Sequence, residues 1–303
     1  MKNAIEVRNL HKSYGDVHAV NGISFYAESG KLFSFLGPNG AGKSTTIDIL
    51  CTLLTRDQGE VTVNGCVLGT EDEKIRKSIG VVFQESCLDT LLTVRENMTT
   101  RAGFYYRDRN EIKKAVRNAA VAADVMAFID RPYGKLSGGQ RRRADIARAL
   151  VHTPRILFLD EPTTGLDPQT RKNVWDTIRR LQEETGMTIF LTTHYMEEAA
   201  HSDYVVIIDH GEIAAKGTPA ELKSAYADDV LRLFSKDDEA LKKALDGEYE
   251  YTQSADQVIL RLPDTLSALP IVERCRGYIH GFEVMRGTMD DAFIRITGKE
   301  IRE

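Results

Sequence analysis

One stretch of the sequence decides the fold, and it reads Gly37-Pro38-Asn39-Gly40-Ala41-Gly42-Lys43-Ser44. The spacing matches G-x-x-x-x-G-K-[ST], in which glycines let successive backbone N–H groups turn toward one anion. A mostly apolar run, residues 31–36, precedes the loop, and apolar residues at helical spacing follow it. A glycine turn without a ligand is the alternative, but both the full pattern and its strand–helix context favour a phosphate-binding loop.

The loop predicts roles for individual residues. Lys43 can reach the β- and γ-phosphates of a nucleotide, and Ser44 can ligate Mg²⁺. The helix after the loop directs its positive end at the same anion. The residues predicted to bind nucleotide here are Gly37, Pro38, Asn39, Gly40, Ala41, Gly42, Lys43, Ser44 and Thr45.

Two acids follow a second apolar run. Residues 156–159 are all apolar, and Asp160 and Glu161 come directly after them. A buried strand does not tolerate an unpaired carboxylate, so the pair should emerge at the carboxyl edge of the sheet, where ligands bind. Alone, the acids could simply end a strand at the surface. Beside the phosphate loop, they predict that Asp160 holds the magnesium and that Glu161 faces the attacking water.

A second glycine-rich helix start lies at Ser137-Gly138-Gly139-Gln140. The N-terminus of a helix is an anion site, and one phosphate loop already covers a nucleotide from one side. This start therefore suggests that the nucleotide of another molecule docks here. The alternative is a plain glycine-rich helix start. The adjacent run Arg141-Arg142-Arg143 is interpreted as a solvated or interdomain face.

With Leu136, this second loop reads LSGGQ, and the chain here resembles the ABC ATPase family over residues 1 to about 225. The resemblance implies that Tyr14 stacks on adenine and that Gln84 senses magnesium and the membrane domain. It implies that His194 is the switch histidine, acting with Glu161, Lys43 and Gln84 in catalysis. Ser44, Gln84 and Asp160 are the implied magnesium ligands. Ser137, Gly138, Gly139, Gln140 and Asp167 would contact nucleotide across a head-to-tail dimer.

The run from Gly138 to Gly165 and the tail 288–298 resemble the ATP-binding subunits of ABC-2-type exporters of the daunorubicin-resistance kind. That resemblance implies ATP and Mg²⁺ as ligands and a drug, lipid or glycan-like cargo. It implies an ABC-2-type membrane permease as one partner, and a second copy of the chain or a homologous ATPase as the other. Nucleic acid is not an expected partner. The identity of the cargo is not readable from this chain.

Composition supports a peripheral, cytoplasmic protein on the inner face of the cell membrane. The chain has 303 residues, a net charge of -5 and four scattered cysteines. We find no signal peptide and no apolar run of the ~18–20 residues that a membrane helix needs. The membrane channel should therefore be a separate polypeptide.

The expected fold is an α/β P-loop ABC ATPase core with an antiparallel β region, followed by a small α+β domain. We place the nucleotide-binding domain at 1–225, with a helical insert at about 90–153, and the C-terminal domain at 226–303. The tail reads strand 229–234, helix 237–246, strands 248–252 and 257–262, helix 264–275 and strand 279–285. This βαββαβ order is the ferredoxin-like arrangement.

Two other functions are considered. An importer ATPase with a regulatory tail usually carries a longer, mainly β C-terminal region. A soluble ABC ATPase acting on ribosomes or DNA would carry two cassettes or an inserted coiled coil or zinc module. This chain shows one cassette and an α+β tail, so export is favoured.

Overall fold

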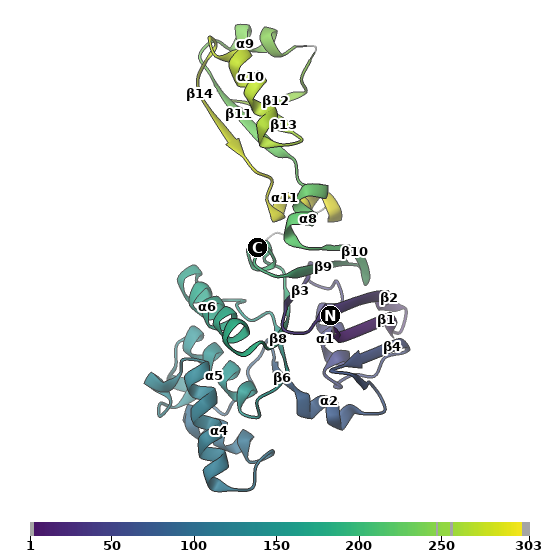
Figure 1. The fold of residues 1–303 in the computed structure, drawn as a ribbon, viewed down its shortest axis with the longest axis vertical. Helices are drawn as coiled ribbons and strands as arrows, with labels where there is room; N and C mark the ends of the chain where they lie inside the picture. The colour runs from purple at the N-terminus through teal and green to yellow at the C-terminus, as the bar shows by residue number, and fades with distance from the viewer. Residues whose placement is uncertain (1–2, 247, 255–256, 299–303) are drawn as a thin grey trace. The chain divides into compact units, whose positions relative to one another are not determined.

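The computed structural model describes residues 3–246, 248–254 and 257–298. It divides into two compact units, Met1–Lys216 and Gly217–Glu303 (Figure 1). We placed the domain boundary at 225/226, whereas the second compact unit begins before helix α8 (Pro219–Tyr226). The reason is packing, because α8 contacts α11 (Met289–Thr297) of the same unit.

The first unit is built on two sheets. The antiparallel sheet has the order β2-β1-β4-β5 and the larger sheet has the order β10-β9-β3-β8-β7-β6. The strands are β1 (Asn3–Tyr14), β2 (Val17–Glu28), β3 (Leu32–Leu36), β4 (Gln58–Val63), β5 (Cys66–Val67), β6 (Ile79–Val82), β7 (Ile156–Asp160), β8 (Thr188–Thr193), β9 (Tyr204–Asp209) and β10 (Glu212–Gly217). Strands β9, β3, β8, β7 and β6 pair in parallel.

The helices of the first unit are α1 (Lys43–Leu50), α2 (Asp72–Ser78), α3 (Val94–Ala102), α4 (Arg109–Ala122), α5 (Gly138–Leu150), α6 (Pro168–Thr185) and α7 (Met196–Ala199), with short 3₁₀ turns Met126–Phe128 and Tyr133–Lys135. Among these helices, α5 packs against the larger sheet, and α3 and α4 pack against α5. The helical insert expected at 90–153 thus corresponds to α3, α4 and α5. Among the described residues, no helix is both long and apolar enough to cross a membrane.

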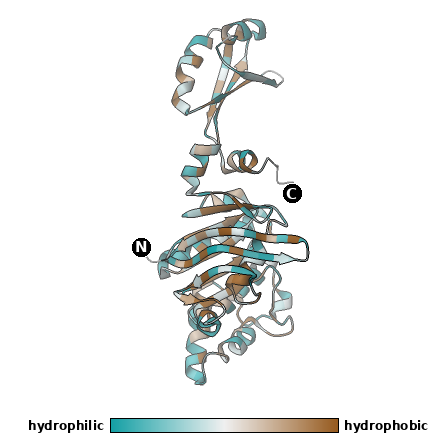
Figure 2. Cartoon of the chain, turned by 90° about the vertical axis from the view of Figure 1, so that its right-hand side faces the viewer, coloured by the Kyte–Doolittle hydropathy of each residue, from teal (hydrophilic) through white to brown (hydrophobic). Residues whose placement is uncertain are grey.

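The larger sheet is buried on both faces, which explains its continuous apolar strands. Leu157 and Leu159 of β7 face the helices of the insert, whereas Ile156 and Phe158 face α1 and the antiparallel sheet. Phe33 and Phe190 stack in this second core with ring centroids 4.9 Å apart. In contrast, the antiparallel sheet alternates hydrophobic and hydrophilic residues along its strands (Figure 2). One of its faces is therefore buried and the other exposed.

One expected helix start was wrong in its detail. The spacing of Thr70-Glu71-Asp72-Glu73 predicts a capping box that starts a helix, but α2 begins at Asp72, and Glu71 precedes it without a side-chain cap. Glu71 instead accepts a hydrogen bond from the backbone N–H of Val67, at 3.0 Å. The stretch Thr218-Pro219-Ala220-Glu221 also has capping-box spacing, and here the capping box is present, with Pro219 in the first helical turn of α8.

The second unit follows the predicted βαββαβ order. Its elements are β11 (Asp229–Ser235), α9 (Asp238–Leu245), β12 (Tyr251–Ser254), β13 (Gln257–Leu262), a 3₁₀ turn (Thr265–Ser267), α10 (Ala268–Cys275) and β14 (Ile279–Met285). They form an antiparallel sheet of order β12-β13-β11-β14. Leu231 and Leu233 of β11 pack in a core with residues of α9 and α10. The unit therefore has a hydrophobic core of its own.

Candidate active site

Four neighbouring strands end at the same edge of the larger sheet, and each delivers one predicted motif there. Strand β3 leads into the glycine loop, β8 into His194, β7 into Asp160 and Glu161, and β6 toward Gln84. A cavity of about 450 Å³ lies at this edge. Its lining residues are Ala19, Asn39, Gly40, Gly42, Lys43, Ser44, Thr45, Gln84, Glu161, Thr164 and His194.

The glycines of the loop are required by close backbone contacts. Gly42 has a φ of 103°, and a Cβ on it would lie 2.2 Å from the carbonyl oxygen of Ala19. A Cβ on Gly37 would lie 2.3 Å from the carbonyl oxygen of Ile208. Any side chain at either position would collide with the neighbouring strands. The loop is therefore held against β2 and β9, with the N-terminus of α1 at the cavity.

Lys43 is buried at the centre of the site, with 4% of its side chain exposed. Its Nζ donates to the carbonyl oxygens of Gly37 at 2.9 Å and Pro38 at 3.1 Å. The same Nζ is 3.2 Å from Oε1 of Glu161. Burial lowers the pKa of Lys43, and the charge of Glu161 opposes that shift. The ammonium group is thus fixed in the cavity by three acceptors.

Glu161 is held in place by its backbone and by its neighbours. Its φ is 44°, in the left-handed region, and its N–H donates to Oγ1 of Thr192 at 3.0 Å. His194 Nδ1 is 3.4 Å from Oε2, and Thr164 Oγ1 donates to the same oxygen at 3.1 Å. His194 and then Lys43 lower the pKa of the Glu161 carboxyl to about 2, against its burial. Glu161 is therefore ionised at neutral pH and able to accept a proton.

Asp160 lies among oxygen donors. Thr192 Oγ1 donates to its Oδ1 at 2.5 Å, and Ser44 Oγ is 3.5 Å from the same oxygen. Gln84 lines the same cavity from the end of β6. A hydroxyl, a carboxylate and an amide oxygen are hard ligands of the kind that Mg²⁺ prefers. The donor set at this edge therefore fits the predicted magnesium.

Arg142 was assigned to a solvated or interdomain face, and this was wrong. Only 7% of the residue is exposed. Its guanidinium donates to four backbone carbonyls, those of Phe83 at 2.5 Å, Pro162 at 2.6 Å, Asp160 at 2.8 Å and Glu161 at 3.0 Å. It thus ties α5 to the ends of β6 and β7. The sequence offered one signal for this role, which is that Arg142 lies in the second turn of a helix that starts at a predicted ligand loop.

The remaining predicted residues lie outside this cavity lining. Ser137 caps α5, and Gln140 completes a capping box with it. Asp167 caps α6 by accepting from the N–H of Thr170 at 3.0 Å. Tyr14 is 51% exposed at the end of β1. The cavity lining therefore brings together the predicted residues Asn39, Gly40, Gly42, Lys43, Ser44, Thr45, Gln84, Glu161 and His194. The predicted residues that are not part of this lining are Gly37, Pro38, Ala41, Asp160, Ser137, Gly138, Gly139, Gln140, Asp167 and Tyr14.

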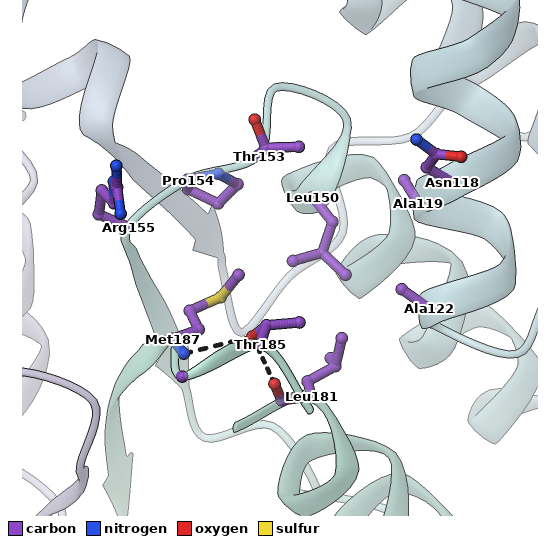
Figure 3. Close-up of a pocket in the computed structure, with 11 residues that line it drawn as sticks. Asn118, Ala119, Ala122, Leu150, Thr153, Pro154, Arg155, Leu181, Thr185 and Met187 are labelled. Atoms are coloured by element: carbon purple, nitrogen blue, oxygen red, sulfur yellow. Dashed lines mark hydrogen bonds between the residues drawn. The ribbon is translucent and has the colours of Figure 1, made fainter. Parts of the chain in front are cut away.

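A second cavity of about 450 Å³ lies at the opposite end of the strands (Figure 3). Leu150, Leu181 and Met187 line it, and Arg155 and Met187 directly precede β7 and β8. Parallel α/β sheets bind their ligands at the carboxyl ends of the strands. The second cavity has the same volume as the first, but none of the predicted site residues line it. The residues that line each cavity, and not the cavity volume, therefore identify the candidate active site.

A glycine loop between a strand and a helix, with an ionised acid at the end of a nearby strand, defines a P-loop nucleotide-binding protein. Sequence comparison narrows this class. A family described as ABC transporter matches residues 20–164. A second, described as ATP-binding protein DrrA1-3-like, C-terminal domain, matches residues 217–297.

Individual relatives are similar in sequence to this chain over nearly its whole length. Nod factor export ATP-binding protein I of Rhizobium sp. (strain N33) is 36% identical, covering 100% of this chain and 99% of the relative. Daunorubicin/doxorubicin resistance ATP-binding protein DrrA of Streptomyces peucetius is 38% identical, covering 97% and 92%. The chain belongs to the family of ABC transporter ATP-binding proteins. The family, fold class and ATPase class predicted from its sequence are confirmed.

Solved structures show the same core. The structure of cbiO1 from Clostridium perfringens, part of the ABC transporter complex cbiONQ, has a TM-score of 0.69 at 29% identity. The matched region covers 80% of this chain and 95% of the cbiO1 chain. A dimeric ATP-binding cassette in a post-hydrolysis state, bound to ADP and Pi, has a TM-score of 0.64 at 30% identity. The matched region covers 71% of this chain and 98% of the cassette chain.

Proposed function

We propose that this ABC ATPase hydrolyses ATP with Glu161 as the general base and so drives an exporter whose channel is a separate permease. The observation that carries the proposal is the position of Glu161. It is ionised, left-handed in its backbone, and placed 3.2 Å from Lys43 and 3.4 Å from His194 in the cavity of the glycine loop. An acid in this place can orient water toward a γ-phosphate.

The chemistry then divides among the residues of the cavity. Water attacks the γ-phosphorus in line, its proton passes toward Glu161, and ADP leaves with the electron pair of the broken P–O bond. Lys43 offsets the negative charge of the β- and γ-phosphates, and His194 contacts the γ-phosphate. Mg²⁺, held by Ser44, Gln84 and Asp160, would supply further charge neutralisation on the phosphates.

The second part of the proposal is a composite site. Ser137, Gly138 and Gly139 begin α5 but do not line the cavity of the glycine loop. This arrangement supports a head-to-tail dimer, in which these residues and Asp167 meet the nucleotide of a second copy or a homologous ATPase. Tyr14, exposed at the end of β1, is available to stack on adenine.

Export is supported by the relatives. The similar proteins named above act in Nod factor export and in daunorubicin/doxorubicin resistance, and the second unit of this chain matches the DrrA-like C-terminal domain. We propose an ABC-2-type permease partner, a drug, lipid or glycan-like cargo, and a place on the inner face of the cell membrane. Co-expression with the candidate permease should bring this chain into the membrane fraction. Recovery only in the soluble fraction would contradict this part of the proposal.

The mechanism is tested by Glu161→Gln. The amide keeps the shape of the side chain but accepts a proton poorly, so ATP should still bind while turnover falls at least 100-fold (~10²-fold). Glu197→Gln is the matched control, because Glu197 is an exposed acid on α7 close in sequence. ATP affinity is measured by calorimetry and turnover by phosphate release. A Glu161→Gln protein with the turnover of the control would remove Glu161 from the mechanism.

A further inference from the structure

A carboxylate outside the cavity lining is buried beside the active site. Glu198 lies on the short helix α7, and only 1% of it is exposed. Its Oε2 accepts a hydrogen bond from Thr193 Oγ1 at 2.6 Å, and its Oε1 accepts one from Thr163 Oγ1. Both threonines are themselves buried. The carboxylate therefore bridges two hydroxyl groups that belong to different loops.

Both loops carry a residue of the proposed mechanism. Thr163 follows Glu161 by two positions after β7, and Thr193 is the residue before His194 at the end of β8. Thr193 Oγ1 also accepts from the N–H of Tyr195 at 2.9 Å, which fixes the turn around His194. The two loops are therefore joined twice, once by the contact between Glu161 and His194 and once by Glu198, which bonds to Thr163 and Thr193.

The bridge is costly for the fold, which argues that its geometry matters. A buried carboxylate loses hydration, and this cost is offset only where hydrogen bonds satisfy its oxygens. Both hydroxyls can donate to the carboxylate, so its two oxygens are satisfied in the ionised form. What an apolar residue would not provide is a directed link between the two loops.

We propose that Glu198 is a positioning residue that sets the distance between Glu161 and His194 through Thr163 and Thr193. The proposal rests on the function proposed for Glu161. Reacting groups displaced by about 1 Å can lose about 100-fold in rate, so a link of this kind acts on turnover and leaves nucleotide affinity unchanged. Gly37 N–H donates to the carbonyl oxygen of Thr193 at 3.2 Å, a backbone contact that a change in the Thr163 side chain leaves in place.

Thr163 offers a matched pair of variants. Thr163→Val keeps the shape and removes the hydroxyl, whereas Thr163→Ser keeps the hydroxyl and removes a methyl group. We expect Thr163→Val to lower kcat about tenfold and Thr163→Ser to keep at least about half of the wild-type kcat. KM for ATP should stay within about twofold in both. Thr177→Val is the control, since Thr177 is also buried but donates within α6, to the carbonyl of Asn173.

The outcomes separate this proposal from a packing role and from the function of Glu161. A packing role predicts the reverse order, with Thr163→Ser impaired and Thr163→Val active, and that result would overturn the bridge. If Thr163→Val does not fold, Glu198→Met, which keeps the approximate length of the side chain and removes both acceptors, must lower kcat, and full activity there would overturn the bridge. In a Glu161→Gln background, Thr163→Val should cause no further loss. A further tenfold loss there would show that the bridge does not act through Glu161.

Discussion

Replacing Arg142 with Met tests a buried link of four hydrogen bonds. The guanidinium donates to the carbonyls of Phe83, Asp160, Glu161 and Pro162, and methionine would leave all four without this donor. Each hydrogen bond to a charged group contributes about 1.5–3 kcal/mol. Simple addition over four bonds overestimates the effect, because neighbours relax and water enters. We expect the unfolding free energy to fall by about 3–5 kcal/mol, the range for removing one partner of a buried charged group.

The assay uses a property of this sequence. Trp175 is the only tryptophan, it lies on α6 of the first unit, and it is 8% exposed. Its fluorescence during urea unfolding therefore reports on the first unit alone. Arg142→Lys keeps the charge but concentrates three donors on one atom, so it should recover less than half of the lost stability.

Arg143→Met provides the control. Arg143 is the next residue on α5, and its contact with Asp124 at 2.6 Å lies at the surface, where ion pairs contribute about 0–1 kcal/mol. Equal stability of Arg142→Met and Arg143→Met, at an unchanged denaturant slope, would refute the role assigned to Arg142.

Four further outcomes follow from the structure. Lys43→Ala should raise the Kd for ATP by at least tenfold (~10-fold) in calorimetry, because it removes the buried cation of the loop. The pKa of Glu161 is lowered to about 2, so its ionised carboxylate stabilises the fold above its ordinary pKa of 4.5 and loses that contribution as the pH falls toward 2. The difference in unfolding free energy between wild type and Glu161→Gln, measured by urea titration, should therefore shrink by about 3 kcal/mol from pH 5 to pH 2. A protein ending at Lys216 should give a sharper, more stable unfolding transition than one ending at Tyr226, since the latter keeps α8 without α11. Mixing Gly138→Asp with Lys43→Ala chains should restore part of the ATPase activity that neither homodimer shows, and mixed dimers that bind ATP but stay inactive would contradict the composite site.

Much of the active site could be predicted because its signals are local. The glycine loop needs a strict spacing, and the acids Asp160 and Glu161 directly follow an apolar strand. Parallel strands end at one edge of a sheet, so adjacent strands bring such motifs together without further information. The second unit was predictable for a similar reason, since alternation between strand and helix patterns gives its order.

The missed features depend on tertiary contacts. Arg142 lies in a run of three arginines, and the sequence does not tell which one faces the ends of β6 and β7. Its partners are backbone carbonyls, which every residue has, so no complementary residue marks them. Thr70 has the spacing of a capping box, but Glu71 bonds to Val67 in the preceding turn. In each case the hydrogen-bond partner that the side chain takes is placed beside it only by the folding of the chain.

On the mechanism proposed above, Glu161 competes with the nucleotide for Lys43. An ammonium group has three N–H donors, and here Gly37, Pro38 and Glu161 take all three. A phosphate oxygen can bind Lys43 only by displacing one of them, and the two carbonyls are fixed in the loop. On the proposed mechanism the carboxylate would give way, and nucleotide binding would separate Glu161 from one of the groups that lower its pKa. Nucleotide binding and activation of Glu161 would then be a single exchange of anions on Lys43.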